Sequence, residues 1–337
     1  MQIEETTNQQ QTEQEATLRA IIIANPAAGT YEQHRQQLEE TQQYLQEQGW
    51  QVEIKLTEEA GDGERIAREA VEQQCNIVIA TGGDGTVNEV IQSLAGSQTA
   101  LGILPSGTVN VWAREIGVPL NNYEQAREIL LHGEQRRIDL GQVNSERYFL
   151  LMSTIGLDAE VTRTVESLTK KFGVFTYLLQ TLKLGLGYPN FTAFLQIGRH
   201  TIRGHALQII FGNTQLYAGA IKFTWHAKAD DGQLDICLVR SKNIFNRFSI
   251  VYDFLFKRKR REQWVRYDSA PEIKIHTNRK VALQVDGDPC GETSQRGTPP
   301  TIIRVVPQAL NVIIPQDYDG ELFSKPASNQ LQAATEK

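Results

Sequence analysis

The sequence predicts an α/β plus all-β protein, in which an N-terminal βαβ domain with a mostly parallel sheet precedes a C-terminal β-sandwich domain. From Leu18 to about Gly133, apolar strand-like runs alternate with helical patterns, which indicates βαβ units. From about Arg137 onward, short β runs with turn residues between them dominate, which is typical of a sandwich. A chain of 337 residues is long enough to form two domains, each with its own core.

The strands expected in the first domain are apolar runs that end in glycine-rich or polar turns. These runs are Ala20–Ala24, Trp50–Leu56, Ile77–Ala80 and Leu101–Leu104. Helical patterns alternate with them, at Tyr31, Leu38 and Leu45, at Ile66, Ala70 and Val71, and at Val87, Val90, Ile91 and Leu94. This alternation predicts a parallel sheet covered by helices.

The second domain is expected to contain mainly short strands. They are predicted at Arg147–Ser153, Phe191–Ile197, His205–Phe211, Leu234–Val239, Glu272–His276, Val281–Val285 and Ile302–Val306. Two apolar patterns at helical spacing interrupt this series, at Phe172–Leu186 and at Ile244–Leu255. The second pattern directly precedes a basic cluster made of Lys257, Arg258, Lys259, Arg260 and Arg261.

The most informative loop is Thr81-Gly82-Gly83-Asp84-Gly85-Thr86-Val87-Asn88, which joins the run Ile77–Ala80 to a helical pattern. A helix N-terminus offers backbone N–H groups to an anion, and glycines let the backbone approach a phosphate closely. Asp84 is suited to hold Mg²⁺ or to orient a phosphate-bound water. The loop therefore predicts a nucleotide-phosphate site, with a glycine-rich turn that binds nothing as the alternative.

Two common phosphate motifs are excluded. The chain contains no Gly-x-x-x-x-Gly-Lys-Ser/Thr segment, so the loop is not a Walker A motif. Asn88 stands where the dinucleotide-binding fingerprint requires its third glycine.

Two further loops follow apolar runs in the same way, Asn25-Pro26-Ala27-Ala28-Gly29-Thr30 and Leu104-Pro105-Ser106-Gly107-Thr108-Val109-Asn110. In an open α/β sheet, ligands bind outside the carboxyl ends of the strands. All three loops are therefore expected to converge on one ligand, although each by itself is also compatible with ordinary turn chemistry.

In this order, Asn-Pro-x-x-Gly, Gly-Gly-Asp-Gly-Thr-x-Asn and Pro-x-Gly-Thr-x-Asn resemble the motifs of the diacylglycerol kinase catalytic domain, and more narrowly of the soluble bacterial lipid kinases of that family. The resemblance covers about residues 19–316. NAD kinases and sphingosine kinases share the Gly-Gly-Asp-Gly-Thr core, whereas the segment Val111-Trp112-Ala113-Arg114 resembles the lipid kinases.

This resemblance implies an NAD kinase/diacylglycerol kinase-like fold with the active site in the cleft between the two domains. The expected bounds are residues 18–136 for the nucleotide-binding domain and 137–306 for the lipid-substrate domain. The chain is expected to return to the first domain at residues 307–318, through Ala309–Pro315. The polar segments 1–17 and 324–337 are expected to be disordered.

The resemblance also implies which residues bind ATP. They are Asn25, Pro26, Gly29, Thr57, Gly82, Gly83, Asp84, Gly85, Thr86, Asn88, Gly107, Thr108 and Asn110. In this scheme Asp84 has a catalytic role near the metal and the γ-phosphate. Gly156 and Asp158 match a further family segment near the cleft.

The segment Lys228-Ala229-Asp230-Asp231-Gly232-Gln233-Leu234-Asp235 resembles the family's structural Mg²⁺ site. Carried over by position, the ligands are the Asp231 carboxylate and the carbonyls of Lys228 and Gln233. Such all-oxygen ligation suits Mg²⁺, with waters completing the octahedron. A β-hairpin turn built on Asp-Gly accounts for the same residues equally well.

The segment Gln284-Val285-Asp286-Gly287-Asp288 resembles the family's Asp-Gly-Glu, whose last carboxylate is the general base on the lipid hydroxyl. Asp288 occupies that position, so the reach of the base is shorter by about 1.5 Å. Without the resemblance, this segment reads as an ordinary turn.

Composition excludes several other classes of protein. The net charge of −6 argues against a nucleic-acid partner, which would require a basic face. Three cysteines without Cys-x-x-Cys spacing indicate neither a disulfide framework nor a zinc site, and they fit a reducing cytoplasm. No apolar run approaches the ~18 residues of a membrane span, and the N-terminal residues lack the features of a signal peptide.

These observations predict a cytoplasmic, ATP- and Mg²⁺-dependent lipid kinase, with diacylglycerol as acceptor and phosphatidate as product. Phosphatidylglycerol, a sphingoid base or a small diol are alternative acceptors, and a protein that binds nucleotide or lipid without catalysis is an alternative of another class. The basic cluster Lys257–Arg261 has two interpretations. It either contacts the inner membrane surface peripherally or is the solvated, charged end of a helix. A homodimer is a further hypothesis.

Overall fold

A computed structural model describes residues 17–26, 31–120, 122–164, 185, 187–217, 219, 221–241, 245–247 and 264–324, with the side chains of residues 31–33 left out. Several predictions fall outside these residues and stay untested. They concern Gly29, most of the helical pattern at 172–186, most of the pattern from Ile244 to Leu255, the basic cluster at 257–261 and most of the polar ends.

The N-terminal domain is a parallel sheet in the strand order β2-β1-β3-β4-β18. Its strands are β1 (Arg19–Ala24), β2 (Gln51–Leu56), β3 (Ile77–Gly82), β4 (Ala100–Pro105) and the last part of β18 (Thr301–Ile314). Both β3 and β4 are buried along their whole length, as apolar runs in a parallel sheet should be. β1 pairs in parallel with both β2 and β3, so the carboxyl ends of these three strands lie at the same edge of the sheet.

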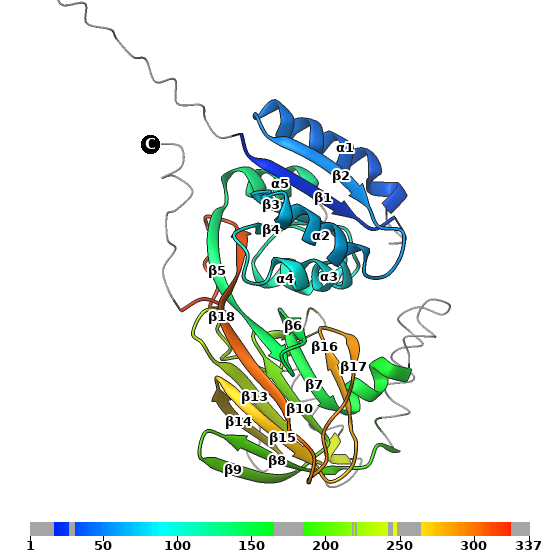
Figure 1. The fold of residues 1–337 in the computed structure, drawn as a ribbon, viewed down its shortest axis with the longest axis vertical. Helices are drawn as coiled ribbons and strands as arrows, with labels where there is room; N and C mark the ends of the chain where they lie inside the picture. Colours follow the sequence, from blue (N-terminus) through cyan, green and yellow to red (C-terminus); the bar gives the residue numbers. More distant parts are fainter. Residues whose placement is uncertain are drawn as a thin grey trace, which may run out of the picture.

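Five helices accompany this sheet in the described part of the chain. They are α1 (Tyr31–Glu47), α2 (Asp62–Glu72), α3 (Asp84–Leu94), α4 (Val111–Glu115) and α5 (Tyr123–His132). α1 packs against α5 and β2, whereas α2 packs against α3 (Figure 1). α1, α2, α3 and α5 contact strands of the sheet, and buried apolar residues such as Leu38 and Leu45 of α1 and Val90 and Ile91 of α3 form their inner faces.

The C-terminal domain is a sandwich of two mainly antiparallel layers. One layer has the strand order β14-β13-β10-β7-β16-β17. Its strands are β7 (Met152–Gly156), β10 (Gln208–Gly212), β13 (Leu234–Val239), β14 (Val265–Ala270), β16 (Ala282–Val285) and β17 (Asp288–Glu292). The other layer is formed by β18, β15 (Glu272–Thr277), β8 (Phe191–Ile197) and β9 (His200–Ala206). Between the layers lies a core that includes the buried side chains of Phe191, Phe211 and Ile155.

A long strand pair connects the two domains. β5 (Glu134–Val143) runs antiparallel to β18 along almost its whole length, and β6 (Arg147–Phe149) pairs with β5 (Figure 1). β18 pairs with β15 through residues 301–304 and then with β4 through Asn311 and Val312. The ten-stranded sheet is therefore continuous through both domains.

The structure confirms the predicted fold class, and it confirms the strands at Phe191–Ile197 and Leu234–Val239 to the residue. Two other strand predictions were wrong. The run Arg147–Ser153 divides into β6 and β7, because Leu150, Leu151 and Met152 donate their N–H groups to the Asp286 carboxylate between the two strands. The run His205–Phe211 divides at Leu207 into β9 and β10, which lie in different layers.

The strands that the sequence did not predict include polar ones at sheet edges. β14 and β17 bound the six-stranded layer, and β9 bounds the other layer. The short strands β11 (Leu216–Tyr217) and β12 (Ile221–Lys222) form a separate hairpin.

Candidate active site

The three predicted loops meet at the carboxyl edge of the parallel sheet. The Asn25 N–H donates to the carbonyl of Thr81 at 3.3 Å, so the loop after β1 adjoins the loop after β3. The Thr57 N–H donates to the carbonyl of Ala24 at 3.0 Å, which brings the end of β2 to the same place. Residues from the ends of β1, β2 and β3 therefore lie together at the sheet edge, as expected for an open α/β sheet.

The loops after β3 and β4 lie directly against each other. The N–H groups of Ser106 and Gly107 donate to the Gly82 carbonyl at 3.2 and 3.1 Å. A Cβ atom on Gly107 would lie 2.5 Å from Cα of Gly83. Only glycine fits at position 107, because the two backbones are in contact there.

The N-terminus of α3 is open. Its N-cap residue is Gly83, which supplies no side-chain hydrogen bond to the first turn. Gly85 in that turn is exposed, and a Cβ atom built on it would meet nothing within 4 Å. Open backbone N–H groups of this kind are suited to bind a phosphate.

Asp84 links this helix to the next loop. Its Oδ1 accepts a hydrogen bond of 2.7 Å from the N–H of Val111, the first residue of α4. Burial raises the pKa of the half-buried Asp84 carboxyl, and hydrogen bonds from nearby backbone N–H groups, first that of Val111, oppose this rise. Asp84 therefore fixes the end of the loop after β4. This contact is additional to the role at a metal or phosphate that the sequence predicts for Asp84.

Asn110 closes the loop after β4. It has a left-handed backbone with φ 48°. Its side chain accepts from the Gly107 N–H at 3.1 Å and donates to the Gly107 carbonyl at 2.6 Å. Thr108 is exposed at the tip of this loop, while Asn110 is buried beneath it.

Asn88 and Asp288 meet across the boundary between the domains. Nδ2 of Asn88, which is buried, donates to Oδ2 of Asp288 at 2.7 Å. Asp288 begins β17, directly after the turn formed by Asp286 and Gly287. Both turn residues have positive φ, 47° and 91°, as in a type I′ hairpin. The Asn88 side chain is therefore turned toward the proposed base, not toward the phosphate loop.

Asp286 is a half-buried partner that sequence reasoning missed. Its carboxylate accepts the N–H groups of Leu150, Leu151 and Met152 at 2.7 to 3.0 Å. Burial raises the pKa of Asp286 to about 7, and the nearby charge of Asp84 acts in the same direction. No local feature of the sequence distinguishes it from Asp288, two positions later.

Thr57 and Asp158 occupy buried positions. Thr57 leads into a loop in which Asp62 accepts the N–H groups of Glu58 and Glu59. These hydrogen bonds, first that of Glu58, lower the pKa of Asp62 to about 2. Asp158 accepts hydrogen bonds from Tyr217, Thr154 and Gln284, and burial raises its pKa.

Through Gln284, Asp158 is connected to the Asp286–Gly287 turn. The Gln284 side chain donates to Asp158 at 3.0 Å and accepts from the Gly287 N–H at 2.7 Å. Gly156, in the same segment as Asp158, has φ 114°, and a Cβ there would lie 2.5 Å from the Leu207 carbonyl. Asp158 thus supports the hairpin that carries Asp288, whereas Gly156 packs against β10.

The predicted metal ligands lie in an acidic region. Asp231 accepts the Gln233 N–H at 2.9 Å, and Lys228 Nζ donates to the Glu321 carbonyl. Burial raises the pKa of Asp231, and the charges of Asp139 and Asp230 raise it further. Burial together with the charge of Asp231 raises the pKa of Asp235 to about 6.

These donors fit Mg²⁺ in chemical type, since carboxylates crowded together favour a cation beside them. Within the described ranges, no group of three or more His, Cys, Asp or Glu side chains is arranged to hold a metal ion. Two of the three expected ligands are backbone carbonyls, which such a side-chain group would not include.

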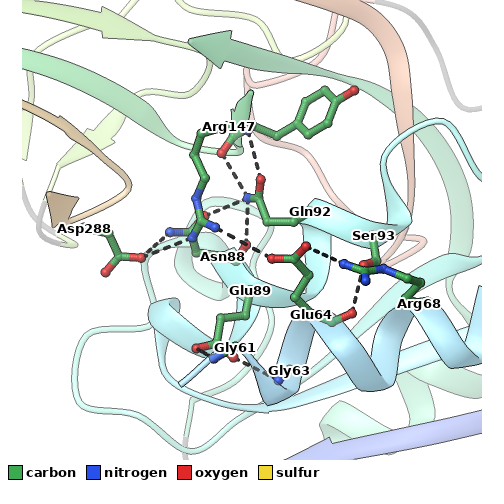
Figure 2. A network of polar contacts seen from close by, with 11 residues as sticks. Gly61, Gly63, Glu64, Arg68, Asn88, Glu89, Gln92, Ser93, Arg147 and Asp288 are labelled. Carbon is green, nitrogen blue, oxygen red and sulfur yellow. Dashed lines mark hydrogen bonds and ion pairs between the residues drawn. The ribbon is translucent and has the colours of Figure 1, made fainter. Parts of the chain in front are cut away.

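Three further polar residues surround the Asn88–Asp288 contact, and no pattern in the sequence pointed to them. They are Gln92 on α3, Glu64 on α2 and Arg147 on β6 (Figure 2). Arg147 lies 3.5 Å from Oδ2 of Asp288 and 4.0 Å from Oε2 of Glu64.

Among the described residues, no helix is long and apolar enough to cross a membrane.

Comparison with protein families gives two matches in succession along the chain. The diacylglycerol kinase catalytic domain matches residues 19–143, and the YegS C-terminal NAD kinase beta sandwich-like domain matches residues 152–314. The first match contains the three glycine-rich loops, and the second contains Asp231 and Asp288.

Curated relatives cover most of the chain. The diacylglycerol kinase of Bacillus subtilis (strain 168) is 28% identical over 273 residues, which are 80% of this chain and 89% of that protein. The diacylglycerol kinase of Staphylococcus saprophyticus subsp. saprophyticus is 29% identical over 306 residues, 90% of this chain and 97% of that protein. A crystal structure of a diacylglycerol kinase from Bacillus anthracis str. Sterne has a TM-score of 0.67 at 22% identity, covering 89% of this chain and 98% of that one. At this identity, the structural likeness shows a shared fold.

Proposed function

Because this chain belongs to the diacylglycerol kinase catalytic domain family and is an ATP-dependent lipid kinase, we propose that it transfers the γ-phosphate of ATP to the primary hydroxyl of diacylglycerol. The product is phosphatidate. The observation that carries this proposal is the 2.7 Å contact between Asn88 and Asp288, which places a carboxylate of the second domain beside the glycine-loop helix of the first.

The triphosphate is proposed to bind at the edge formed by the loops after β1, β3 and β4. The open N-terminus of α3 and the exposed backbone at Gly85 support this placement. Phosphoryl transfer depends mainly on alignment and on neutralisation of charge, because its transition state is loose. Rigid packing of Gly83 against Gly107 supplies the alignment.

Asp288 is proposed as the general base that accepts the proton of the acceptor hydroxyl. It lies at the start of a hairpin whose turn is fixed by Asp286, since that carboxylate binds three successive backbone N–H groups. This fixed turn supports the use of aspartate where the family more commonly has glutamate.

Mg²⁺ is proposed to bind the Asp231 carboxylate and the carbonyls of Lys228 and Gln233. When bound there, the ion supplies positive charge to a crowded acidic region, which includes Asp139, Asp230 and Asp235. Asp84 is proposed to act beside the metal that accompanies ATP.

The identity of the lipid that accepts the phosphate is the more specific part of the proposal. Relatives named diacylglycerol kinase favour diacylglycerol over phosphatidylglycerol, a sphingoid base or a small diol. Cytoplasmic location, contact of residues 257–261 with a membrane and assembly into a homodimer stay predictions.

The proposal is tested by transfer of labelled γ-phosphate from Mg·ATP into a total lipid extract in mixed micelles. We expect the wild type to label one lipid that co-migrates with phosphatidate, and Asp288→Asn and Asp84→Asn each to abolish the label while staying folded. Asp268→Asn is a matched control, because Asp268 is a carboxylate paired with Arg266 on the edge strand β14. Binding of Mg·ATP without transfer to any lipid would instead indicate a binding protein.

A further inference from the structure

Gln92 clamps α3 to the backbone of β6. Its Oε1 accepts from the Tyr148 N–H at 3.0 Å, and its Nε2 donates to the Tyr148 carbonyl at 3.1 Å (Figure 2). One side chain thus bonds both backbone groups of Tyr148, as a residue of a neighbouring strand would. The clamp fixes β6, and therefore the adjacent Arg147, against the nucleotide-binding domain.

The same amide also sets the orientation of Asn88. Nε2 of Gln92 donates to the backbone carbonyl of Asn88 at 2.9 Å and to its Oδ1 at 3.1 Å. With Oδ1 occupied in this way, Nδ2 of Asn88 is the atom that faces Asp288. Since Asn88 is only 1% exposed, its amide is held in this orientation by surrounding protein.

Arg147 reaches the same carboxylate oxygen as Asn88 does. Its guanidinium lies 3.5 Å from Oδ2 of Asp288, and on its other side it lies 4.0 Å from Glu64. A hydrogen-bond donor and a positive charge beside one carboxylate oxygen favour the ionised form, which is the form that accepts a proton. Exposure of the Asp288 side chain, at 51%, weakens this effect without removing it.

Other charged and titratable groups also face this carboxylate or its immediate surroundings. They are Glu64 on α2, Glu146 before β6, Cys290 on β17, and Asp84 and Asp286 at the neighbouring turns. All of these except the cysteine are acidic, whereas Arg147 brings a positive charge to within 3.5 Å of Asp288. Its removal would take that positive charge away from the carboxylate.

We propose that Gln92 and Arg147 are positioning residues for the kinase reaction: Gln92 orients Asn88 and anchors β6, and Arg147 together with Asn88 holds Asp288 ionised and fixed at the cleft. This inference rests on the proposed function, in which Asp288 is the general base. It gives the domain boundary a catalytic role, because the base is held correctly only when α3 and β6 are docked.

The test is the pH dependence of kcat and the KM for ATP in the lipid-kinase assay. In Arg147→Gln, the acidic limb of the kcat profile should move to higher pH by about half to one unit, since the base becomes easier to protonate. KM for ATP should stay within about twofold, because the lost contact is to the base and not to nucleotide. Arg147→Lys should restore the position of the limb.

Arg68→Gln is the matched control. Arg68 pairs with the same Glu64 at 2.8 Å, whereas Arg147 also lies 3.5 Å from Asp288, so the pH profile of Arg68→Gln should match the wild type. Gln92→Met removes the amide at similar length, and it should lower kcat about tenfold with little change in KM. Thermal unfolding of each variant shows that the protein remains folded at the assay temperature.

A limb that stays in place in Arg147→Gln overturns the inference, as does a raised KM for ATP with unchanged kcat, which would make Arg147 a nucleotide ligand. These results leave the proposed function standing. A wild type that transfers no phosphate to lipid overturns the proposed function, and the inference falls with it.

Discussion

Gly83 and Gly107 touch across two loops that are joined to different strands, and a Cβ atom on Gly107 would lie 2.5 Å from Cα of Gly83. The loop after β3 is therefore shaped by the loop after β4 and not only by its own sequence. Two glycines of the same motif set have different reasons for being glycine. Gly107 is required by packing within the protein, whereas Gly85 faces open space.

Substitution at these two glycines separates a ligand site from an ordinary turn. Gly107→Ala should destabilise the fold, by about 1–3 kcal/mol, because the methyl group overpacks the contact. Gly85→Ala should leave stability unchanged or raise it slightly, since alanine favours the helix by up to about 1 kcal/mol over glycine. It should nevertheless weaken Mg·ATP binding about tenfold or more, because the methyl group occupies space through which phosphate approaches.

Urea unfolding and isothermal titration with Mg·ATP measure the two effects. If Gly85→Ala binds Mg·ATP as tightly as the wild type, the open face of the loop is not the phosphate site. This segment would then be better interpreted as a glycine-rich turn that binds no ligand.

Tyr217 and Asp158 give a prediction about the support of the hairpin that carries Asp288. Tyr217 donates a hydrogen bond to the buried Asp158 carboxylate, which Gln284 links to the turn before Asp288. Tyr217→Phe removes a donor from a buried charged group, and it should lower the free energy of unfolding by about 1–3 kcal/mol.

A double-mutant cycle checks that this loss comes from the Tyr217–Asp158 contact. The double variant Tyr217→Phe/Asp158→Asn should be clearly less destabilised than the sum of the two single variants. Strictly additive losses of unfolding free energy would show that the Tyr217 hydroxyl and the Asp158 carboxylate act independently. Other contacts would then hold the hairpin in position.

The sequence was sufficient for those features that local pattern determines. Apolar runs followed by glycine and asparagine predicted the three loops, and parallel strands place such loops at one edge whatever their separation in the chain. β5 was not predicted because it begins with the polar residues Glu134–Arg137, and its partner β18 lies more than 150 positions away.

The polar network of the site could not be predicted for a similar reason. Gln92 and Tyr148 are 56 positions apart, and Asn88 and Asp288 are 200 positions apart, so no local pattern connects them. The sequence likewise could not assign different roles to Asp286 and Asp288. Their difference comes from the hairpin turn, which directs one carboxylate to the backbone of residues 150–152 and the other to Asn88.

Asp286 predicts a characteristic dependence of stability on pH. Its pKa is raised from 3.8 to about 7, so between these values the folded protein binds this proton more tightly than the unfolded chain does. The stabilisation is therefore complete below pH 3.8 and is lost as pH rises through about 7. Asp286→Asn cannot titrate, so the stability of the wild type relative to this variant should fall across that window by about 1–2 kcal/mol, after allowance for solvent at this half-buried group.

Urea unfolding of both proteins from about pH 4.5 to about pH 8.5 measures this difference. The range avoids Asp62, whose pKa is lowered to about 2 and whose contribution is lost only at acid pH. A difference that is constant, or that grows with pH, would mean that the three N–H donors outweigh burial and hold Asp286 ionised throughout.

The acidic region around Asp231 predicts a response to metal removal. Burial, and then the charges of Asp139 and Asp230, raise the pKa of Asp231, and Mg²⁺ bound there would relieve the repulsion, so the folded wild type should gain stability from the ion. We expect chelation with EDTA to lower its Tm by about 2–4 °C, which corresponds to roughly 1 kcal/mol for a chain of this size. Asp231→Asn lacks the carboxylate ligand, and its Tm should not respond to EDTA.

Asp268→Asn should respond to EDTA like the wild type, because its carboxylate lies on β14 and pairs with Arg266. If Asp231→Asn loses as much Tm on chelation as the wild type does, then the stabilising ion is bound elsewhere. The Asp-Gly turn at 231–232 would in that case be a hairpin turn only, and Asp231 and Asp235 would relieve their repulsion by taking up protons, which their raised pKa values already favour.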